Sequence, residues 1–203
     1  MTLKGRETRQ RIVDAAADLM YASGVAAVTL DDVGEATNTS KSQLYHYFHD
    51  RNDLVRAVIE RQRQRVLGHQ RPILESVRDW ADLERWRDQI LATQSTRSCR
   101  GGCPLGSLAN ELSESDDAAR VQLAEAFSSW EQLIAEGLAR MISTGLLSSN
   151  ADPAELALGV LASLQGGLLL SEMQRSTQPL EIALDAALAH LRSFSTSQSE
   201  RDS

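Results

Sequence analysis

The chain has 203 residues, enough for one large domain or two small ones with a substantial apolar core. Its two cysteines and its polar first ten residues argue against a secreted disulfide-rich protein and a secretory signal, and they favour a cytoplasmic protein. The net charge of −7 argues at first against nucleic-acid binding. Aromatic residues make up only 4% and the apolar content is mostly Leu and Ala, so we expect an all-α fold.

The acidity lies in the C-terminal part of the chain. Residues 1–65 carry a net charge of +1, and the remaining residues carry −8. Basic side chains of the N-terminal part could converge on phosphates once folded. The basic residues at the extreme N-terminus could form an arm on DNA, or they could belong to a frayed, solvated tail. These basic residues are Lys4, Arg6, Arg9, Arg11, Lys41, Arg51 and Arg56.

The segment 29–48 predicts two short helices joined by a sharp turn, the layout of a helix-turn-helix. Thr29 is a candidate N-cap of the first helix. Asn38 tolerates the left-handed conformation that a tight turn needs, and Ser40 is a candidate N-cap for a second helix at 41–47. The inward face of the first helix is expected to carry Leu30, Val33 and Ala36.

The outer face of the helix at 41–47 suits DNA. Lys41 can donate to guanine, and Gln43 can make a bidentate pair with adenine. Tyr45 and His46 have polar tips suited to phosphates. An ordinary amphipathic helix pair is the alternative interpretation. The core side chains of this helix are expected to be Leu44 and Phe48. The candidate DNA-contacting residues are Thr29, Lys41, Ser42, Gln43, Tyr45, His46 and Arg51.

The rest of the chain is expected to be helical, with a loop-like interval at 95–106. Pro72 should bend or end the first long helix near residues 69–71. The apolar stretch 156–170 is too short for a confident membrane span and predicts a helix buried on two sides. The expected helices cover about 51–77, 83–93, 105–112, 116–144 and 152–176, with a last one from 179.

Aromatic side chains with one amide could line a cavity in the C-terminal part, although core packing is the alternative. The candidate ligand-binding residues are Trp86, Leu105, Leu108, Phe127, Trp130 and Gln165. The last two helices also carry more apolar surface than one face needs, and Gly166–Gly167 permits close helix approach. This favours a four-helix dimer interface over burial within one subunit. The candidate interface residues are Leu164, Leu168, Leu184, Leu188 and Leu191.

The first 60 residues resemble the N-terminal domain of the TetR family of bacterial repressors. The resemblance rests on three parts of this segment. Residues 9–16 resemble the first helix of the family, Ser23–Gly24 would end it, and Val28–Thr29 would open the next. The family pattern is matched at Val33, Gly34, Thr37, Asn38, Thr39, Ser40, Lys41, Leu44, Tyr45, Tyr47, Phe48 and Arg51. The chain departs from it with Gly34 for the usual Ala, Asn38 for Gly, and Thr39 for an apolar residue. Gly34 should loosen its helix slightly.

Residues 101–112 resemble a GCPxGxLAxEL signature of the subgroup related to the lincomycin-resistance repressor. This resemblance implies a ligand-responsive core and a dimer built from the last two helices. Cys99 and Cys103, four residues apart, could instead be a redox pair or metal thiolates. No histidine is adjacent and four ligands are not in view, so loop packing is favoured.

These observations predict a helix-turn-helix DNA-binding domain at 1–50, a ligand-binding and dimerisation domain at 51–195, and a disordered tail at 196–203. The expected function is that of a homodimeric transcriptional repressor on a palindromic operator, released by a small, largely apolar or aromatic effector. We expect no cofactor, no metal, no catalytic residue and no membrane partner. The alternative is a helical small-molecule carrier or enzyme that retains a helix pair of this kind.

Overall fold

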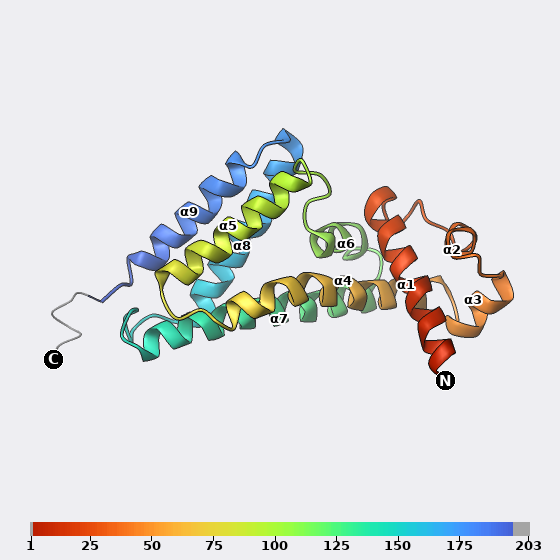
Figure 1. The fold of residues 1–203 in the computed structure, drawn as a ribbon, viewed down its shortest axis with the longest axis horizontal. Coiled ribbons are helices and arrows are strands. Elements are labelled where there is room, and N and C mark those ends of the chain that lie inside the picture. The colour runs from red at the N-terminus through yellow and green to blue at the C-terminus, as the bar shows by residue number, and fades with distance from the viewer. Residues whose placement is uncertain (1, 197–203) are drawn as a thin grey trace. The chain divides into compact units, whose positions relative to one another are not determined.

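The computed structural model describes residues 2–196, and within this range its helices are joined by turns and short loops (Figure 1). The single strand-like pairing in the described range is an isolated bridge between Leu147 and Ser195. The expected all-α fold is confirmed. Most of the tail predicted at 196–203 lies outside the described residues. The described helices are α1 (Leu3–Ser23), α2 (Leu30–Thr37), α3 (Lys41–Tyr47), α4 (Arg51–Leu74), α5 (Trp80–Thr96), α6 (Pro104–Leu112), α7 (Asp117–Ser143), α8 (Pro153–Gln174) and α9 (Gln178–Arg192).

The helices form two compact units. The first comprises Met1–Val66 with Pro104–Ala126, and the second comprises Leu67–Cys103 with Phe127–Ser203. The long helices α4 and α7 therefore contribute to both. The first unit extends beyond the predicted boundary at residue 50, because the start of α4, all of α6 and the start of α7 belong to it.

The first unit is built on α1, which starts earlier than the sequence suggested. Thr2 caps its first turn by accepting a hydrogen bond from the Gly5 amide at 3.2 Å. Lys4 and Arg6 consequently lie on a helix and not in a frayed tail. The buried side of α1 carries residues at spacings of three and four, which a helix places on one face. They are Ile12, Val13, Ala16, Ala17 and Met20.

Ion pairs join α1 to α4. Asp14 accepts from Arg61 Nε at 2.5 Å and from Arg65 Nη2 at 2.7 Å. Burial raises the pKa of the Asp14 carboxyl, but hydrogen bonds from Arg61 and Gln10 outweigh it, so the pKa lies below its usual 3.8. The carboxylate is therefore ionised at neutral pH and holds the two helices together.

The inward face of α2 differs from the expectation. Val33 is buried and Leu30 is half-buried, but Ala36 is exposed, and Gly34 and Thr37 face the interior in its place. A Cβ at Gly34 would lie 2.9 Å from the Thr39 carbonyl oxygen. Gly34 thus permits close approach of α2 to the following turn, a role beyond the slight loosening that the sequence suggested.

Two helix ends differ from the sequence expectation. The helix α4 continues through Pro72 to Leu74, so Pro72 does not end it at residues 69–71. Arg140 donates to the carbonyl oxygens of Leu74 and Val77, which provides partners for backbone groups at and beyond this helix end. The helix α5 begins at Trp80 because Asp79 caps it, accepting from the Asp82 amide at 3.0 Å.

In the second unit α5, α8 and α9 run side by side (Figure 1). The helices α8 and α9 approach closely at Gly167, where a Cβ would lie 2.9 Å from Leu180 Cα. By length and composition α8 is apolar enough to cross a membrane, a criterion that a core helix also meets. One face of α8 is open in the single chain, so the predicted burial of α8 on two sides stays a prediction for an assembled dimer. The exposed side chains of this face are Leu158, Leu169, Leu170 and Met173.

Candidate functional site

The turn between α2 and α3 has the geometry of a tight helix-turn-helix. Asn38 adopts the left-handed conformation, with φ 50° and ψ 45°, and its amide donates to the Glu35 carbonyl at 3.2 Å. Thr39 is buried and donates from its amide to the Gly34 carbonyl at 2.8 Å. Ser40 caps α3 by accepting from the Gln43 amide. Both predictions about this turn, the left-handed Asn38 and the Ser40 cap, are confirmed.

The outer face of α3 is open to solvent. Lys41, Ser42, Tyr45 and His46 are all exposed, whereas Leu44 is buried at 1% exposure. Lys41 Nζ lies 3.4 Å from a carboxylate oxygen of Asp31, and both side chains are mostly exposed. Such a pair contributes little, so Lys41 can exchange it for another partner. The outer face of α3 therefore presents the Lys41 ammonium group together with the polar side chains of Ser42, Tyr45 and His46 to solvent.

Gln43 has an intramolecular role that the sequence reading missed. Its Oε1 accepts from the Ser40 amide at 3.1 Å and from the Ser40 hydroxyl at 3.2 Å, which completes a capping box. A bidentate pair with adenine needs this oxygen as an acceptor. In this conformation only the Nε2 donor remains for an external partner. The S-x-x-Q spacing of residues 40–43 was the signal for this role.

Thr29 and Arg51 also make internal contacts. Thr29 caps α2, and its hydroxyl donates to Asp32 Oδ2 at 2.6 Å. That bond and one from the Thr29 amide lower the pKa of the Asp32 carboxyl. Arg51 is half-buried, and its guanidinium donates to the carbonyl oxygens of Val25 and Val28. In this structure Thr29 caps the start of α2, and Arg51 holds the turn that precedes it. The DNA contacts predicted for both residues stay predictions.

The α1–α2 turn (residues 24–28) is held from two sides. Arg51 donates hydrogen bonds to carbonyl oxygens of this turn, and Glu111, near the end of α6, accepts hydrogen bonds from its backbone amides. Glu111 Oε2 accepts from the Val25 amide at 2.7 Å and from the Ala26 amide at 3.4 Å. Gly24 leaves room for this carboxylate, because a Cβ there would lie 3.2 Å from Glu111 Oε2. The turn that leads into α2 is thus fixed to α4 and α6.

The loop before α6 is bound to the end of α8. Positive φ values of 51° at Ser98, 52° at Cys99, 83° at Gly101 and 53° at Gly102 coil its backbone tightly. The Gly101 amide donates to Glu172 Oε1 at 3.1 Å. Arg175 Nη1 donates to the Cys99 carbonyl at 3.1 Å. Concave backbone of this kind binds carboxylates well.

The glycines and cysteines of this loop have distinct environments. Gly102 has a φ of 53°, and a Cβ there would lie 2.6 Å from Glu172 Oε2, so a larger residue would have to displace the end of the Glu172 side chain. Cys99 and Cys103 are not joined in a disulfide, and both are buried, at 3% and 8% exposure. No cluster of metal-binding side chains occurs among the described residues.

The candidate ligand-binding residues fall into both units. Trp86, Phe127, Trp130 and Gln165 belong to the second, while Leu105 and Leu108 are buried in the first. The Trp86 indole donates to Gln70 Oε1 at 2.5 Å. Trp130 Nε1 and Gln165 Nε2 are buried with no hydrogen-bond partner in the described part of the chain. These two nitrogens therefore differ from the indole nitrogen of Trp86, which has a hydrogen-bond acceptor.

The five leucines predicted for a dimer interface are buried inside the protomer. The exposed fractions are 1% for Leu164, 5% for Leu168, 1% for Leu184, 5% for Leu188 and 1% for Leu191. The open apolar surface of these helices consists of other residues. They are Leu158, Leu169, Leu170 and Met173 of α8, with Ile182 of α9. We call this set the α8–α9 apolar face.

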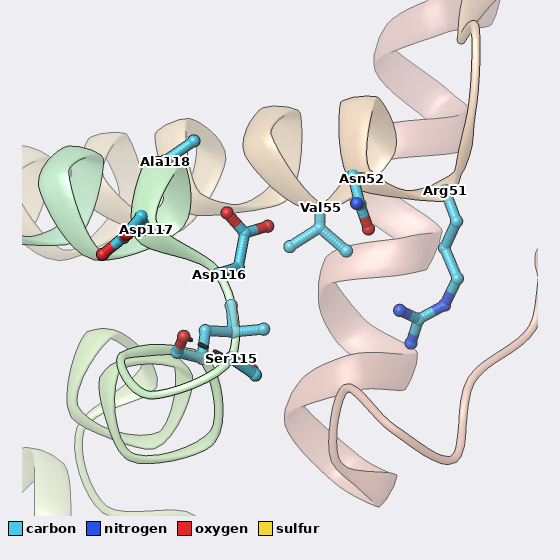
Figure 2. Close-up of a pocket in the computed structure, with 8 residues that line it drawn as sticks. Arg51, Asn52, Val55, Ser115, Asp116, Asp117 and Ala118 are labelled. Carbon is cyan, nitrogen blue, oxygen red and sulfur yellow. Dashed lines mark hydrogen bonds between the residues drawn. The ribbon is translucent and has the colours of Figure 1, made fainter.

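A hollow of about 450 Å³ lies in the first unit, beside the start of α7. Figure 2 shows Asp116 pointing towards α4, whereas the guanidinium of Arg51 points away from that helix. None of the six candidate ligand-binding residues lines this hollow. It is lined by Arg51, Asn52, Val55, Leu112, Ser115, Asp116, Asp117 and Ala118.

Comparison with known proteins agrees with the two-part organisation. Residues 12–58 match the family described as bacterial regulatory proteins, tetR family. Residues 80–186, more than half of the chain, match the C-terminal domain of LmrA/YxaF-like transcriptional regulators. The chain belongs to the TetR family. It is a helix-turn-helix transcriptional regulator of the LmrA/YxaF-like type.

Individual relatives match over most of the chain. An HTH-type transcriptional regulator in the lacX 3′ region of Lactococcus lactis is 32% identical over 185 residues, covering 89% of this chain and 91% of that protein. The HTH-type regulator LmrA of Bacillus subtilis is 24% identical, with 86% and 91% covered. A TetR-family regulator from Cytophaga hutchinsonii has the same fold, with a TM-score of 0.82 at 19% identity over 98% of this chain and 100% of that one.

Proposed function

We propose that this regulator is a cytoplasmic, homodimeric repressor that binds a palindromic operator and leaves it when a small molecule binds the second unit. The observation that carries the proposal is the outer face of α3. It presents exposed Lys41, Ser42, Tyr45 and His46, while Ser40 and Gln43 stabilise the start of the helix by their mutual capping. In a helix-turn-helix the first turn of the second helix reaches the base edges.

The division of labour on DNA follows from which atoms remain available. Lys41 would read guanine, and Gln43 would donate from Nε2 to an acceptor on a base or phosphate. Tyr45 and His46 would bind phosphates. Thr29 and Arg51 would act mainly by holding the start of α2, because their polar groups are engaged within the chain. We therefore expect Arg51 substitutions to affect folding as well as DNA affinity.

The Gln43→Glu variant separates capping from DNA contact. Glutamate at the third helical position completes a capping box as glutamine does, but it lacks the amide donor and adds a negative charge. We expect an unchanged melting temperature together with a loss of operator affinity of about tenfold or more. Fluorescence anisotropy with labelled operator and circular dichroism measure the two effects. Operator affinity equal to that of wild type would remove Gln43 from the DNA interface.

The homodimer would form through the α8–α9 apolar face. Its five side chains are from 52% to 73% exposed in the single chain, and large exposed apolar patches mark interaction surfaces. Gly166 adds to this face a position where no atom would meet a Cβ within 4 Å. A second copy of α8 and α9 on this face would make a four-helix interface and bring two α3 helices to one DNA.

The effector signal would pass through the segment that precedes and includes α6. At one end Glu172 and Arg175 of α8 hold the loop at 98–103, and at the other Glu111 of α6 holds the α1–α2 turn. A shift of α8 on effector binding would thus be transmitted by the chain itself to the start of α2. The effector lowers operator affinity by the ratio of its affinities for the two states.

The rival function is a helical carrier or enzyme that keeps the helix pair for other reasons. Anisotropy titration with DNA from upstream of the chain's own gene discriminates between them, with a scrambled duplex of equal length as control. A repressor binds the upstream duplex at least a hundredfold more tightly at physiological salt. A carrier or enzyme binds the two duplexes alike.

A further inference from the structure

The capping of α3 fixes which end of the Gln43 side chain is available to DNA. Gln43 Oε1 accepts from the Ser40 amide at 3.1 Å and from the Ser40 hydroxyl at 3.2 Å. A backbone amide can only donate, so the Gln43 atom that it meets must be the oxygen and not the nitrogen. The exposed Gln43 side chain therefore has its acceptor bound within the chain, and its Nε2 donor is left for an outside partner.

Two further acceptor groups of this surface are also engaged within the chain. Ser40 Oγ accepts from the Gln43 amide at 3.3 Å, which completes the mutual cap. The carboxylate of Asp31, on the neighbouring helix α2, lies 3.4 Å from Lys41 Nζ. DNA phosphates would repel this carboxylate, and this repulsion favours its place beside the Lys41 ammonium group.

The groups that remain at the start of α3 are mainly donors. An ammonium group has three N–H donors and no acceptor, so Lys41 keeps donors beyond the one directed at Asp31. The exposed Ser42 hydroxyl can donate or accept, so it favours neither kind of base edge. The selective groups are thus Lys41 Nζ and Gln43 Nε2, and both can only donate.

We propose that each operator half-site presents guanine to both Lys41 and Gln43, so that the start of α3 selects bases by their acceptors. This inference rests on the proposed function and specifies its DNA sequence. In the major groove guanine offers two acceptors, N7 and O6, whereas adenine offers N7 beside an N6 amino donor. The two N–H groups of Gln43 Nε2 suit the guanine edge, but they would face the adenine amino group donor to donor. The contact with adenine that the sequence suggested for Gln43 thus gives way to one with guanine.

Base substitutions test this preference with the wild-type protein. Selection of binding sites from random duplexes by the full-length protein should enrich guanine, on either strand, at two positions in each half-site. The selected duplex is then changed one guanine at a time, and affinity is measured by fluorescence anisotropy. Hypoxanthine keeps N7 and O6 and should bind within about twofold of guanine. A deazaguanine without N7, or adenine with its amino group in place of O6, should weaken binding by about fivefold or more.

The variant Gln43→Glu should reverse the preference at one of the two positions. Glutamate keeps an oxygen for the cap, but it has a second acceptor in place of the Nε2 donor. This acceptor suits the amino group of cytosine and not the guanine edge. We expect Gln43→Glu to prefer cytosine to guanine at that position by about fivefold or more, and to keep the guanine preference at the position read by Lys41.

Two other variants complete the assignment. Lys41→Met should lose the guanine preference at the other position, where Gln43→Glu keeps it. The matched control is Gln89→Glu, which adds the same charge at an exposed position of α5 and should keep both preferences. Circular dichroism verifies that each variant is folded. If Gln43→Glu does not fold, the base substitutions on the wild type still decide between guanine and adenine.

Adenine at the selected positions, or equal binding of the guanine and deazaguanine duplexes, would overturn the inference. An unchanged guanine preference at both positions in folded Gln43→Glu would overturn the assignment of Gln43. A protein that selects no DNA sequence at all refutes the repressor function. A protein that selects a palindrome without these guanines refutes the inference about the base contacts alone.

Discussion

Replacing Glu111 with alanine removes the carboxylate that holds the α1–α2 turn to α6. Its Oε2 accepts from the Val25 amide at 2.7 Å and from the Ala26 amide at 3.4 Å, and Val25 is only 2% exposed. Hydrogen bonds to a charged group contribute about 1.5–3 kcal/mol. Because the Glu111 side chain is exposed and the second bond is long, we expect a value near the lower limit, about 1.5 kcal/mol. That value corresponds to about a tenfold more frequent opening of the turn.

Hydrogen–deuterium exchange measures this opening directly. In Glu111→Ala, peptides that cover residues 24–28 should exchange about tenfold faster than in wild type, while peptides from α9 should be unchanged. Glu111→Gln keeps an uncharged acceptor and should lie between the two. The matched control is Glu114→Ala, which removes an exposed glutamate from the turn after α6. If Glu111→Ala and Glu114→Ala exchange alike at 24–28, the reasoning about this contact is refuted.

Four further substitutions test other parts of the structure. Gly34→Ala should lower stability by about 1 kcal/mol in thermal unfolding, because its Cβ would meet the Thr39 carbonyl at 2.9 Å; a more stable variant would contradict this close approach. Leu169→Glu, on the exposed face, should give a folded monomer by light scattering, whereas Leu184→Glu should unfold the second unit; a folded dimer with glutamate at Leu169 would move the interface elsewhere. Asp14→Asn should be less stable than wild type at pH 7. Because the folded-state pKa of Asp14 is lowered, this difference is present above the unfolded pKa of about 3.9 and should vanish as the pH falls through the folded value. Equal melting temperatures at pH 7 would show that its ion pairs do not stabilise the fold.

Local patterns in the sequence predicted the helix-turn-helix well. Asn38, Ser40 and the ends of α3 follow from backbone preferences and capping chemistry that act within a few residues. The core positions Leu44 and Phe48 follow from helical spacing in the same way. The inward place of Ala36 was wrong, because the tight turn brings Gly34 and Thr37 to the interior instead.

Long-range contacts could not be predicted from these patterns. Nothing local to Glu111 indicates that it binds amides of Val25 and Ala26, which are more than 80 residues away. The apolar pattern of α8 likewise did not show which side packs on α9. Leu164 and Leu168 are on the buried side and Leu169 is on the open one, although all three are equally apolar. The choice between core and interface depends on the tertiary arrangement.

Hydroxyl-radical footprinting of the wild-type protein on its own upstream DNA tests the central claim most directly. A homodimer that places two α3 helices in successive major grooves should protect two symmetric patches on one face of the duplex, about one helical turn or a multiple of it apart. The variant Lys41→Ala should weaken both patches equally, because each protomer contributes one α3. Protection of a single patch would contradict the account. Uniform protection along the duplex, the same for any DNA sequence tested, would contradict it as well.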